Sequence, residues 1–228
     1  MTRQLTFDLP LREARGRADF FVAPANALAL ASLDSWRHWP GGKMVLTGPP
    51  GSGKTHLTHV WAGAAGARVV EAGALPEDLP GLSQAPVAVE GADRIGGTAA
   101  ETALFHLHNL MAEAGQPLLV TAVGPPRDWG LRLPDLASRM QAAGVARLAP
   151  PDDALLAAVM MKLFADRQIA VAPALIQWLV PRMDRSFAAA RDLVAALDAR
   201  ALAEARPITR AMAASLMGTP DLFGDLPD

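Results

Sequence analysis

The chain has no cysteine and no tyrosine among its 228 residues, and aromatic residues make up only 5% of it. The absence of cysteine excludes disulfides and thiolate metal sites, and it is typical of proteins in a reducing cytoplasm. Basic residues are not in excess either, since 21 Lys and Arg stand against 23 Asp and Glu. A net charge of -2 gives no overall attraction to a phosphate backbone, so the composition does not favour direct DNA binding.

Long apolar runs are also missing. Charges at Asp8, Arg12 and Arg15 interrupt the first segment, which excludes a signal peptide there, and no later stretch approaches the ~20 apolar residues that cross a membrane. With 51% hydrophobic residues, the composition is that of a folded globular protein. We therefore expect a cytoplasmic protein with no membrane partner, built as one large domain or as a medium domain with a small companion.

Strand and helix patterns alternate over the first two thirds of the chain. Short apolar runs predict five strands, at 43–47, 68–71, 86–90, 117–121 and 145–148. Strands that alternate with helices predict a parallel sheet covered on both faces. After Pro150 and Pro151 only helical spacing remains, which predicts a small all-helical domain with helices near 155–164, 174–182, 187–204 and 208–217.

Two helix starts carry a capping signal in the sequence. Asn26 precedes the periodic residues Leu28, Leu30 and Leu33, so the first helix is predicted to begin there. Thr98 and Glu101 match the S/T-x-x-E pattern, which predicts a capping box at the start of the helix after the third strand.

The most specific motif directly follows the first predicted strand. It fits G-x-x-x-x-G-K-S/T and consists of Gly48, Pro49, Pro50, Gly51, Ser52, Gly53, Lys54 and Thr55. Its place between a strand and a helix distinguishes it from an ordinary Gly-Pro turn. In such a loop the backbone amides and the helix N-terminus point at phosphates, the lysine meets the β- and γ-phosphates, and the threonine hydroxyl binds Mg²⁺. The loop therefore predicts ADP or ATP with Mg²⁺ as cofactors.

A carboxylate at the end of the third strand completes this prediction. Glu90 follows Val87, Ala88 and Val89 and is expected to support the Mg²⁺ shell, as the acidic residue of a Walker B strand does.

Several short motifs along the chain together resemble the AAA+ module of the bacterial replication initiator DnaA. They are the continuation of the phosphate loop from Gly53 to Leu57, Pro125-Pro126, Ser138-Arg139, and Pro150 to Asp152, in this order. Phe21, Val22 and Asn26 to Ala29 resemble the family's segment near the adenine site. The likeness extends over about residues 19–217.

The resemblance implies a fold and a domain layout. It implies an α/β AAA+ P-loop NTPase core, with a five-stranded parallel sheet and helices on both faces, and a small C-terminal all-helical lid domain. The expected parts are a flexible N-terminal arm (1–19), the nucleotide-binding domain (20–150), the lid (151–218) and a flexible tail (219–228).

The first residues resemble a peptide that docks on the sliding clamp, the β subunit of DNA polymerase III. They fit Q-L-x-L-x-L/F through Gln4, Leu5, Phe7 and Leu9, whose apolar side chains would enter a preformed groove. No basic helix-turn-helix domain follows the lid, so sequence-specific DNA binding is not expected. The combination is similar to the Hda family, AAA+ regulators that inactivate DnaA while docked on the clamp and are associated with an ADP-bound active form.

The resemblance also implies roles for single residues near the nucleotide. Arg139 corresponds to the arginine finger that reaches a neighbouring subunit's γ-phosphate; the alternative is a surface arginine in a local ion pair. Thr121 corresponds to sensor I, and Arg185 or Arg191 to the sensor II arginine. His56, which follows the loop, belongs to the expected nucleotide site.

One departure from the family concerns hydrolysis. Gly91 stands where AAA+ ATPases usually carry a second carboxylate that polarises water, and Asp93 lies two positions further on. Weak intrinsic hydrolysis is therefore expected.

The resemblance predicts a negative regulator of replication initiation that stimulates ATP hydrolysis by DnaA. The alternatives are a free-standing AAA+ ATPase, such as a helicase loader, and a small-molecule P-loop kinase. Self-association stays open.

Overall fold

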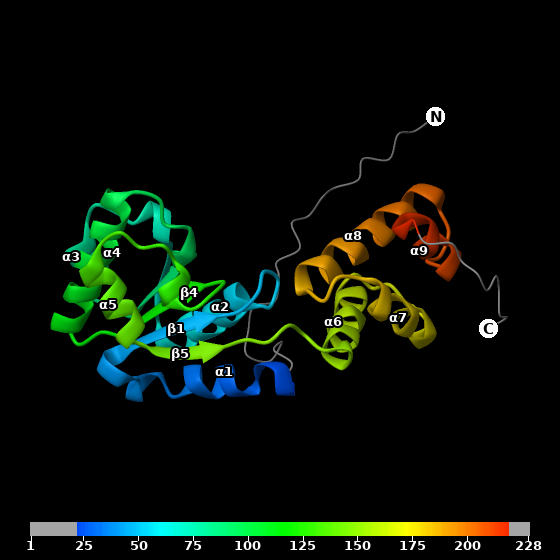
Figure 1. Ribbon diagram of the computed structural model, residues 1–228. Helices are drawn as coiled ribbons and strands as arrows, with labels where there is room; N and C mark the ends of the chain where they lie inside the picture. The colour runs from blue at the N-terminus through cyan, green and yellow to red at the C-terminus, as the bar shows by residue number, and fades with distance from the viewer. Residues whose placement is uncertain (1–21, 219–228) are drawn as a thin grey trace.

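A five-stranded parallel sheet organises the first part of the chain. The computed structural model describes residues 22–218. The strands are β1 (Lys43–Thr47), β2 (Arg68–Glu71), β3 (Val87–Glu90), β4 (Leu118–Ala122) and β5 (Gly144–Arg147). Their spatial order is β2-β3-β4-β1-β5, and every neighbouring pair is parallel (Figure 1). Because all strands run the same way, their carboxyl ends meet at one edge of the sheet.

Helices cover both faces of the sheet. They are α1 (Pro24–Asp34), α2 (Lys54–Ala65), α3 (Leu79–Leu82), α4 (Thr98–Glu113) and α5 (Pro134–Ala142). In β1, Val45 faces one layer of helices, while Met44 and Leu46 face the other. Short 3-10 turns lie between these elements, at Trp36–His38, Pro40–Gly42, Ala72–Ala74, Ala92–Arg94 and Pro126–Asp128.

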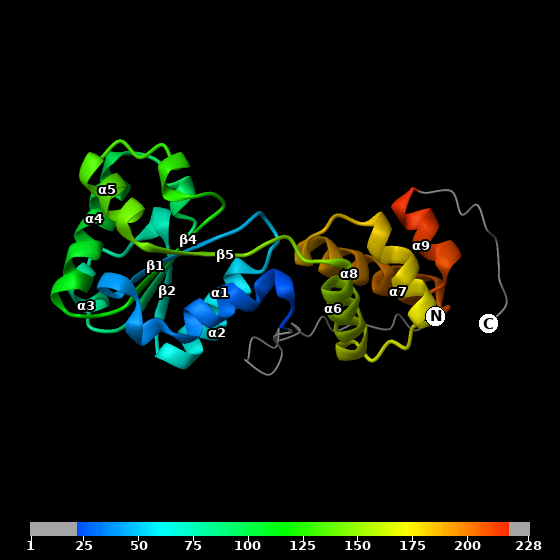
Figure 2. The same ribbon diagram turned by 60° about the horizontal axis from the view of Figure 1, so that its bottom comes forward.

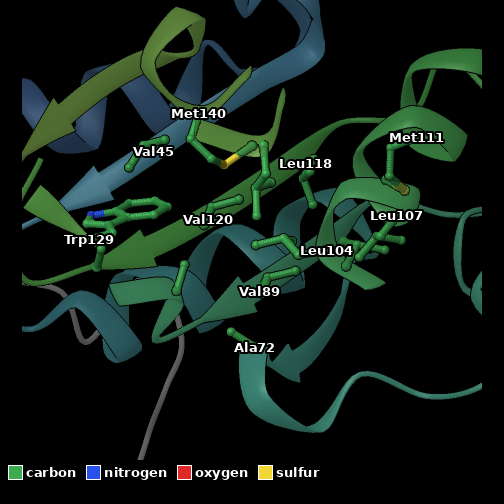
Figure 3. Close-up of a cluster of buried hydrophobic side chains, with 14 of the residues drawn as sticks. Val45, Ala72, Val89, Leu104, Leu107, Met111, Leu118, Val120, Trp129 and Met140 are labelled. Carbon is green, nitrogen blue, oxygen red and sulfur yellow. The ribbon is translucent and has the colours of Figure 1, made fainter. Parts of the chain in front are cut away.

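The larger of the two sheet cores lies under α4 and α5 (Figure 3). Leu104, Leu107 and Met111 of α4 pack there against strand residues such as Val89 and Val120. On the opposite face, the rings of Trp39 and Trp61 stack at 5.3 Å between centroids and cover that side together with α1 and α2. Both faces of the central strands are thus sealed, which explains their continuous apolar sequence.

The rest of the described chain is helical and has its own core. It consists of α6 (Asp153–Asp166), α7 (Pro173–Leu179), a 3-10 turn (Val180–Arg182), α8 (Phe187–Glu204) and α9 (Arg210–Met217). These helices lie beside the sheet, beyond the end of β5 (Figure 1). A cluster that includes Leu156, Phe164, Leu179 and Val194 joins them.

Two predicted helix starts were wrong in detail. Helix α1 begins at Pro24, before Asn26, and the Asn26 side chain reaches back to accept a hydrogen bond from the Ala23 N–H at 2.9 Å. The predicted capping box is not formed, since Gly97 caps α4 without a side-chain bond. The Glu101 carboxylate accepts instead from the backbone N–H groups of Arg132 and Leu133.

Between residues 22 and 218, no helix is both long and apolar enough to cross a membrane.

Candidate functional site

The glycine-rich loop connects β1 to α2 at the carboxyl edge of the sheet. β1 is fully buried between β4 and β5, so it holds the loop from a rigid base. Gly51 and Gly53 have φ of +70° and +93°, a backbone region that other residues rarely adopt. Gly53 is also the N-cap of α2, whose first turn contains no acidic residue. The free amides of this helix start therefore favour an anion.

The Lys54 ammonium lies inside the loop. Its Nζ donates to the carbonyl oxygens of Gly48 at 2.6 Å and Pro49 at 2.9 Å. Burial lowers the pKa of Lys54, while the carboxylates of Asp93 and, less strongly, Glu90 act in the opposite direction. The loop thus combines a lysine, backbone amides and a helix N-terminus around one point, which is the arrangement that holds a phosphate.

Two polar side chains lie at or next to the carboxyl ends of the neighbouring strands β3 and β4. Glu90 ends β3 and is 8% exposed, and its Oε1 has no hydrogen-bond partner among the described residues. Thr121 of β4 is buried and its Oγ1 accepts a hydrogen bond from the Gly91 N–H at 3.2 Å. A buried carboxylate oxygen without a partner fits the donor chemistry of Mg²⁺, which prefers oxygen ligands.

The backbone explains why glycine stands at position 91. Gly91 has φ of +73°, and a Cβ there would lie 2.4 Å from the Arg94 Nη2 atom. This conformation opens the 3-10 turn Ala92–Arg94. The turn carries Asp93, whose charge is the strongest attractive influence on the Lys54 ammonium. Asp93 is therefore the acidic residue of this turn whose charge acts on Lys54 in the phosphate loop.

The start of α8 contacts the loop directly. The Phe187 N–H donates to the Gly51 carbonyl at 2.9 Å. Figures 1 and 2 both show the loop after β1 reaching toward the start of α8. A Cβ at Gly51 would lie 2.5 Å from the Cβ of Ser186, and one at Gly53 would lie 3.0 Å from the Phe187 ring. Sequence reasoning did not identify Ser186 and Phe187 as loop contacts, although Ser186 carries a capping signal that marks the helix start.

The predicted sensor II arginines lie on the helical part. Arg185 forms an ion pair with Asp153 at 2.9 Å, and its side chain is 61% exposed. Arg191 lies farther along α8 and pairs with Asp192 at 3.7 Å. The sensor II role of Arg185 or Arg191 stays a prediction.

The remaining predicted nucleotide residues are placed as follows. Thr55 is exposed and His56 half-buried in the first turn of α2. Val22 is exposed beside the start of α1. Phe21 lies outside the described residues, as do Gln4, Leu5, Phe7 and Leu9.

Arg139 lies at the opposite edge of the sheet from the phosphate loop. It is exposed in the last turn of α5, a few residues before β5 begins. A strand of this length spans on the order of 15 Å, so the two edges are well separated. Within residues 22–218 Arg139 forms no hydrogen bond and no ion pair, so the local ion pair that was the alternative is absent there. Its charge is one of the influences on the buried His108 of α4.

Comparisons with known structures match this architecture. Domain III of the replication initiation protein DnaA from Thermotoga maritima is similar with a TM-score of 0.79 at 19% identity, over 92% of this chain and 98% of that one. AMPPCP-bound DnaA from Aquifex aeolicus gives 0.65 at 12%, over 79% and 64%. The Thermotoga maritima RuvB Holliday junction branch migration motor gives 0.64 at 18%, over 85% and 67%. No protein-family model matches the chain. The fold is a DnaA-like AAA+ fold, as predicted.

A methyl group at Gly51 tests the loop. We expect Gly51→Ala to weaken binding of a fluorescent ADP analogue by roughly tenfold or more, because the positive φ costs about 1–3 kcal/mol and the new Cβ collides with Ser186. Fluorescence titration measures the dissociation constant. The control is Gly63→Ala in α2, where a Cβ meets nothing within 4 Å. Equal affinity for both variants would contradict this loop geometry.

Stability should fall in mild acid because of His108. Burial, followed by the charges of Lys43 and Arg139, lowers the pKa of His108 from 6.5, although a hydrogen bond to Asn109 opposes the shift. Below about pH 6.5 the unfolded chain then binds more protons at this residue than the folded chain, so the free energy of unfolding decreases as pH falls, by at most about 1.4 kcal/mol per pH unit. In urea unfolding, the free energy of unfolding of His108→Gln should decrease less as the pH falls. His106 is exposed, so His106→Gln should show the same pH dependence as the parent chain.

Proposed function

We propose that the chain binds ADP or ATP together with Mg²⁺ at the loop of residues 48–55. The proposal is supported by the buried strand that holds the loop, by the free start of α2 and by Lys54. Lys54 exchanges the Gly48 and Pro49 carbonyls for phosphate oxygens, while Thr55 supplies a hydroxyl to the metal. Glu90 supports the metal shell with the oxygen that has no partner within the described residues. AMPPCP-bound DnaA, which is similar in fold, is a structural precedent.

In this proposal the nucleotide is mainly a structural ligand. The φ of +73° at Gly91 favours glycine over a residue with a water-polarising carboxylate at that position. Intrinsic hydrolysis is therefore slow, and ADP is the resident nucleotide of the active form. The charge of Asp93 opposes the lowering of the Lys54 pKa. This interaction favours the second candidate function, a free-standing AAA+ ATPase of the helicase-loader kind, in which Asp93 would take part in hydrolysis.

We infer that Arg139 acts as an arginine finger on a partner. The observation that carries this inference is an exposed guanidinium, unpaired within residues 22–218, at the sheet edge away from the chain's own phosphate loop. From that edge Arg139 acts on the nucleotide of another molecule and not on the nucleotide bound by its own chain. A cation at the equatorial oxygens of a γ-phosphate stabilises the charge that develops in the transition state.

The partner that we propose is DnaA bound to ATP. The residues from Gln4 to Leu9 dock on the sliding clamp, and the AAA+ core then completes the DnaA site with Arg139. The result is a negative regulator of replication initiation in the cytoplasm, with a nucleotide-binding domain at 20–150 and a lid at 151–218. Similarity in fold to domain III of DnaA supports this pairing, because domains of the same fold can assemble with one another through repeated head-to-tail contacts.

Removal of the guanidinium is the direct test of the finger. We expect Arg139→Ala to lose on the order of 10³-fold of the stimulated ATP hydrolysis by DnaA, measured in single turnover on clamp-loaded DNA. Nucleotide and clamp binding should stay unchanged. Arg68→Ala removes an exposed arginine from the start of β2, the outer strand on the far side of the sheet from β5, and should keep full stimulation. Full stimulation by Arg139→Ala would reject the regulatory role.

A second test concerns the clamp. The double variant Gln4→Ala with Leu5→Ala should bind immobilised clamp roughly tenfold more weakly or worse, because it loses the amide and one apolar anchor of the peptide. Surface plasmon resonance measures this affinity. Arg12→Ala with Glu13→Ala, in the same segment but outside the motif, is the control. Equal affinities of the two double variants would place clamp binding elsewhere and would favour the free-standing ATPase.

A further inference from the structure

Glu101 is a buried carboxylate in the first turn of α4, and only 3% of its surface is exposed. It forms no ion pair with any described residue. Its Oε2 accepts two hydrogen bonds, from the backbone N–H groups of Arg132 and Leu133, each at 2.8 Å. Both groups stand directly before Pro134, where α5 begins. The carboxylate therefore joins the first turn of α4 to the start of α5.

Helix α5 needs this connection because its own N-terminus lacks a cap. Its N-cap residue is Leu133, which has no side-chain acceptor, and its first residue, Pro134, has no N–H. A carboxylate that accepts two N–H bonds at a helix start is favoured by the helix dipole and by its own charge. Glu101 thus supplies from another helix the cap that the local sequence does not provide.

The other end of α5 carries Arg139. The helix has nine residues, and Leu136 and Met140 bury one side of it in the core under α4. A nine-residue helix is a short rigid rod of about 14 Å. Its direction is set by the apolar contacts along its length and by the position of its start. A change at the start is therefore transmitted to the exposed arginine in the last turn.

We propose that Glu101 is a positioning residue for Arg139: by holding the backbone before α5, it sets where the guanidinium stands relative to a partner's phosphate. This inference rests on the proposed function of Arg139. Glu101 itself touches no nucleotide. Catalytic alignment is sensitive to such placement, since a shift of about 1 Å can cost on the order of 100-fold in rate.

The test separates the rate of the stimulated reaction from the strength of docking. Hydrolysis of ATP by DnaA is followed in single turnover over a range of concentrations of the full chain, with the clamp present. We expect Glu101→Ala to lower the maximal stimulated rate by roughly 10- to 100-fold. The concentration that gives half of the maximal rate should stay within about twofold, because the docking peptide and the rest of the surface are intact.

Conservative variants and a matched control complete the design. Glu101→Gln keeps an acceptor oxygen and should recover most of the maximal rate, whereas Glu101→Asp withdraws the carboxylate by one methylene and should lose most of it. Glu113→Ala removes an exposed carboxylate from the end of the same helix and should behave as the parent chain. If Glu101→Ala does not fold, the Gln and Asp variants carry the test by themselves, at a temperature where melting curves show them folded.

The outcomes distinguish this inference from the proposed function. An unchanged maximal rate in Glu101→Ala, or in Glu101→Asp, overturns the positioning role, as does a change confined to the half-saturating concentration. If Arg139→Ala loses stimulation while the Glu101 variants keep it, only the present inference fails. If Arg139→Ala also keeps full stimulation, the finger itself is rejected and the positioning role with it.

Discussion

The candidate nucleotide site depends on a closed turn of backbone around the Lys54 ammonium. Two carbonyl oxygens, of Gly48 and Pro49, point at this cation, and the glycines at 51 and 53 supply the positive φ values that let the chain turn back into α2. The turn is held on one side by a strand buried on both faces and on the other by the start of α8. The folded backbone thus holds the lysine in place within the loop.

The carboxyl and amino edges of the parallel sheet carry different candidate functional residues. The carboxyl edge gathers the phosphate loop, Glu90 and Thr121, while the amino edge lies next to the end of α5 and Arg139. A single chain therefore has the candidate nucleotide site at one edge and an exposed guanidinium at the other. In the proposed function, the Arg139 of one molecule would meet the nucleotide of a neighbouring molecule in a head-to-tail contact.

Local patterns predicted most of the fold, and long-range contacts escaped prediction. The bounds of β1, β2 and α8 follow from apolar runs and helical spacing, and the structure agrees with them. The phosphate loop could also be predicted from the sequence, because the spacing of its glycines, lysine and threonine reflects a local requirement of the backbone. Glu101 shows the limit: its sequence position fits a capping box, yet its acceptor oxygen serves amides 31 and 32 residues away. The contact between Gly51 and Phe187 likewise joins segments that no periodicity connects.

The proposed function of Arg139 does not require an excess of positive charge in a chain whose net charge is -2. It requires one exposed guanidinium at the amino edge of the sheet. At the amino edge of the sheet, burial and then the charges of Lys43 and Arg139 lower the pKa of His108. An arginine in such surroundings has no internal counter-ion among the described residues, so its electrostatic attraction is directed outward. In the proposed function, specificity would come from the placement of one guanidinium by α5. A diffuse basic surface, which attracts any nucleic acid, is not part of that proposal.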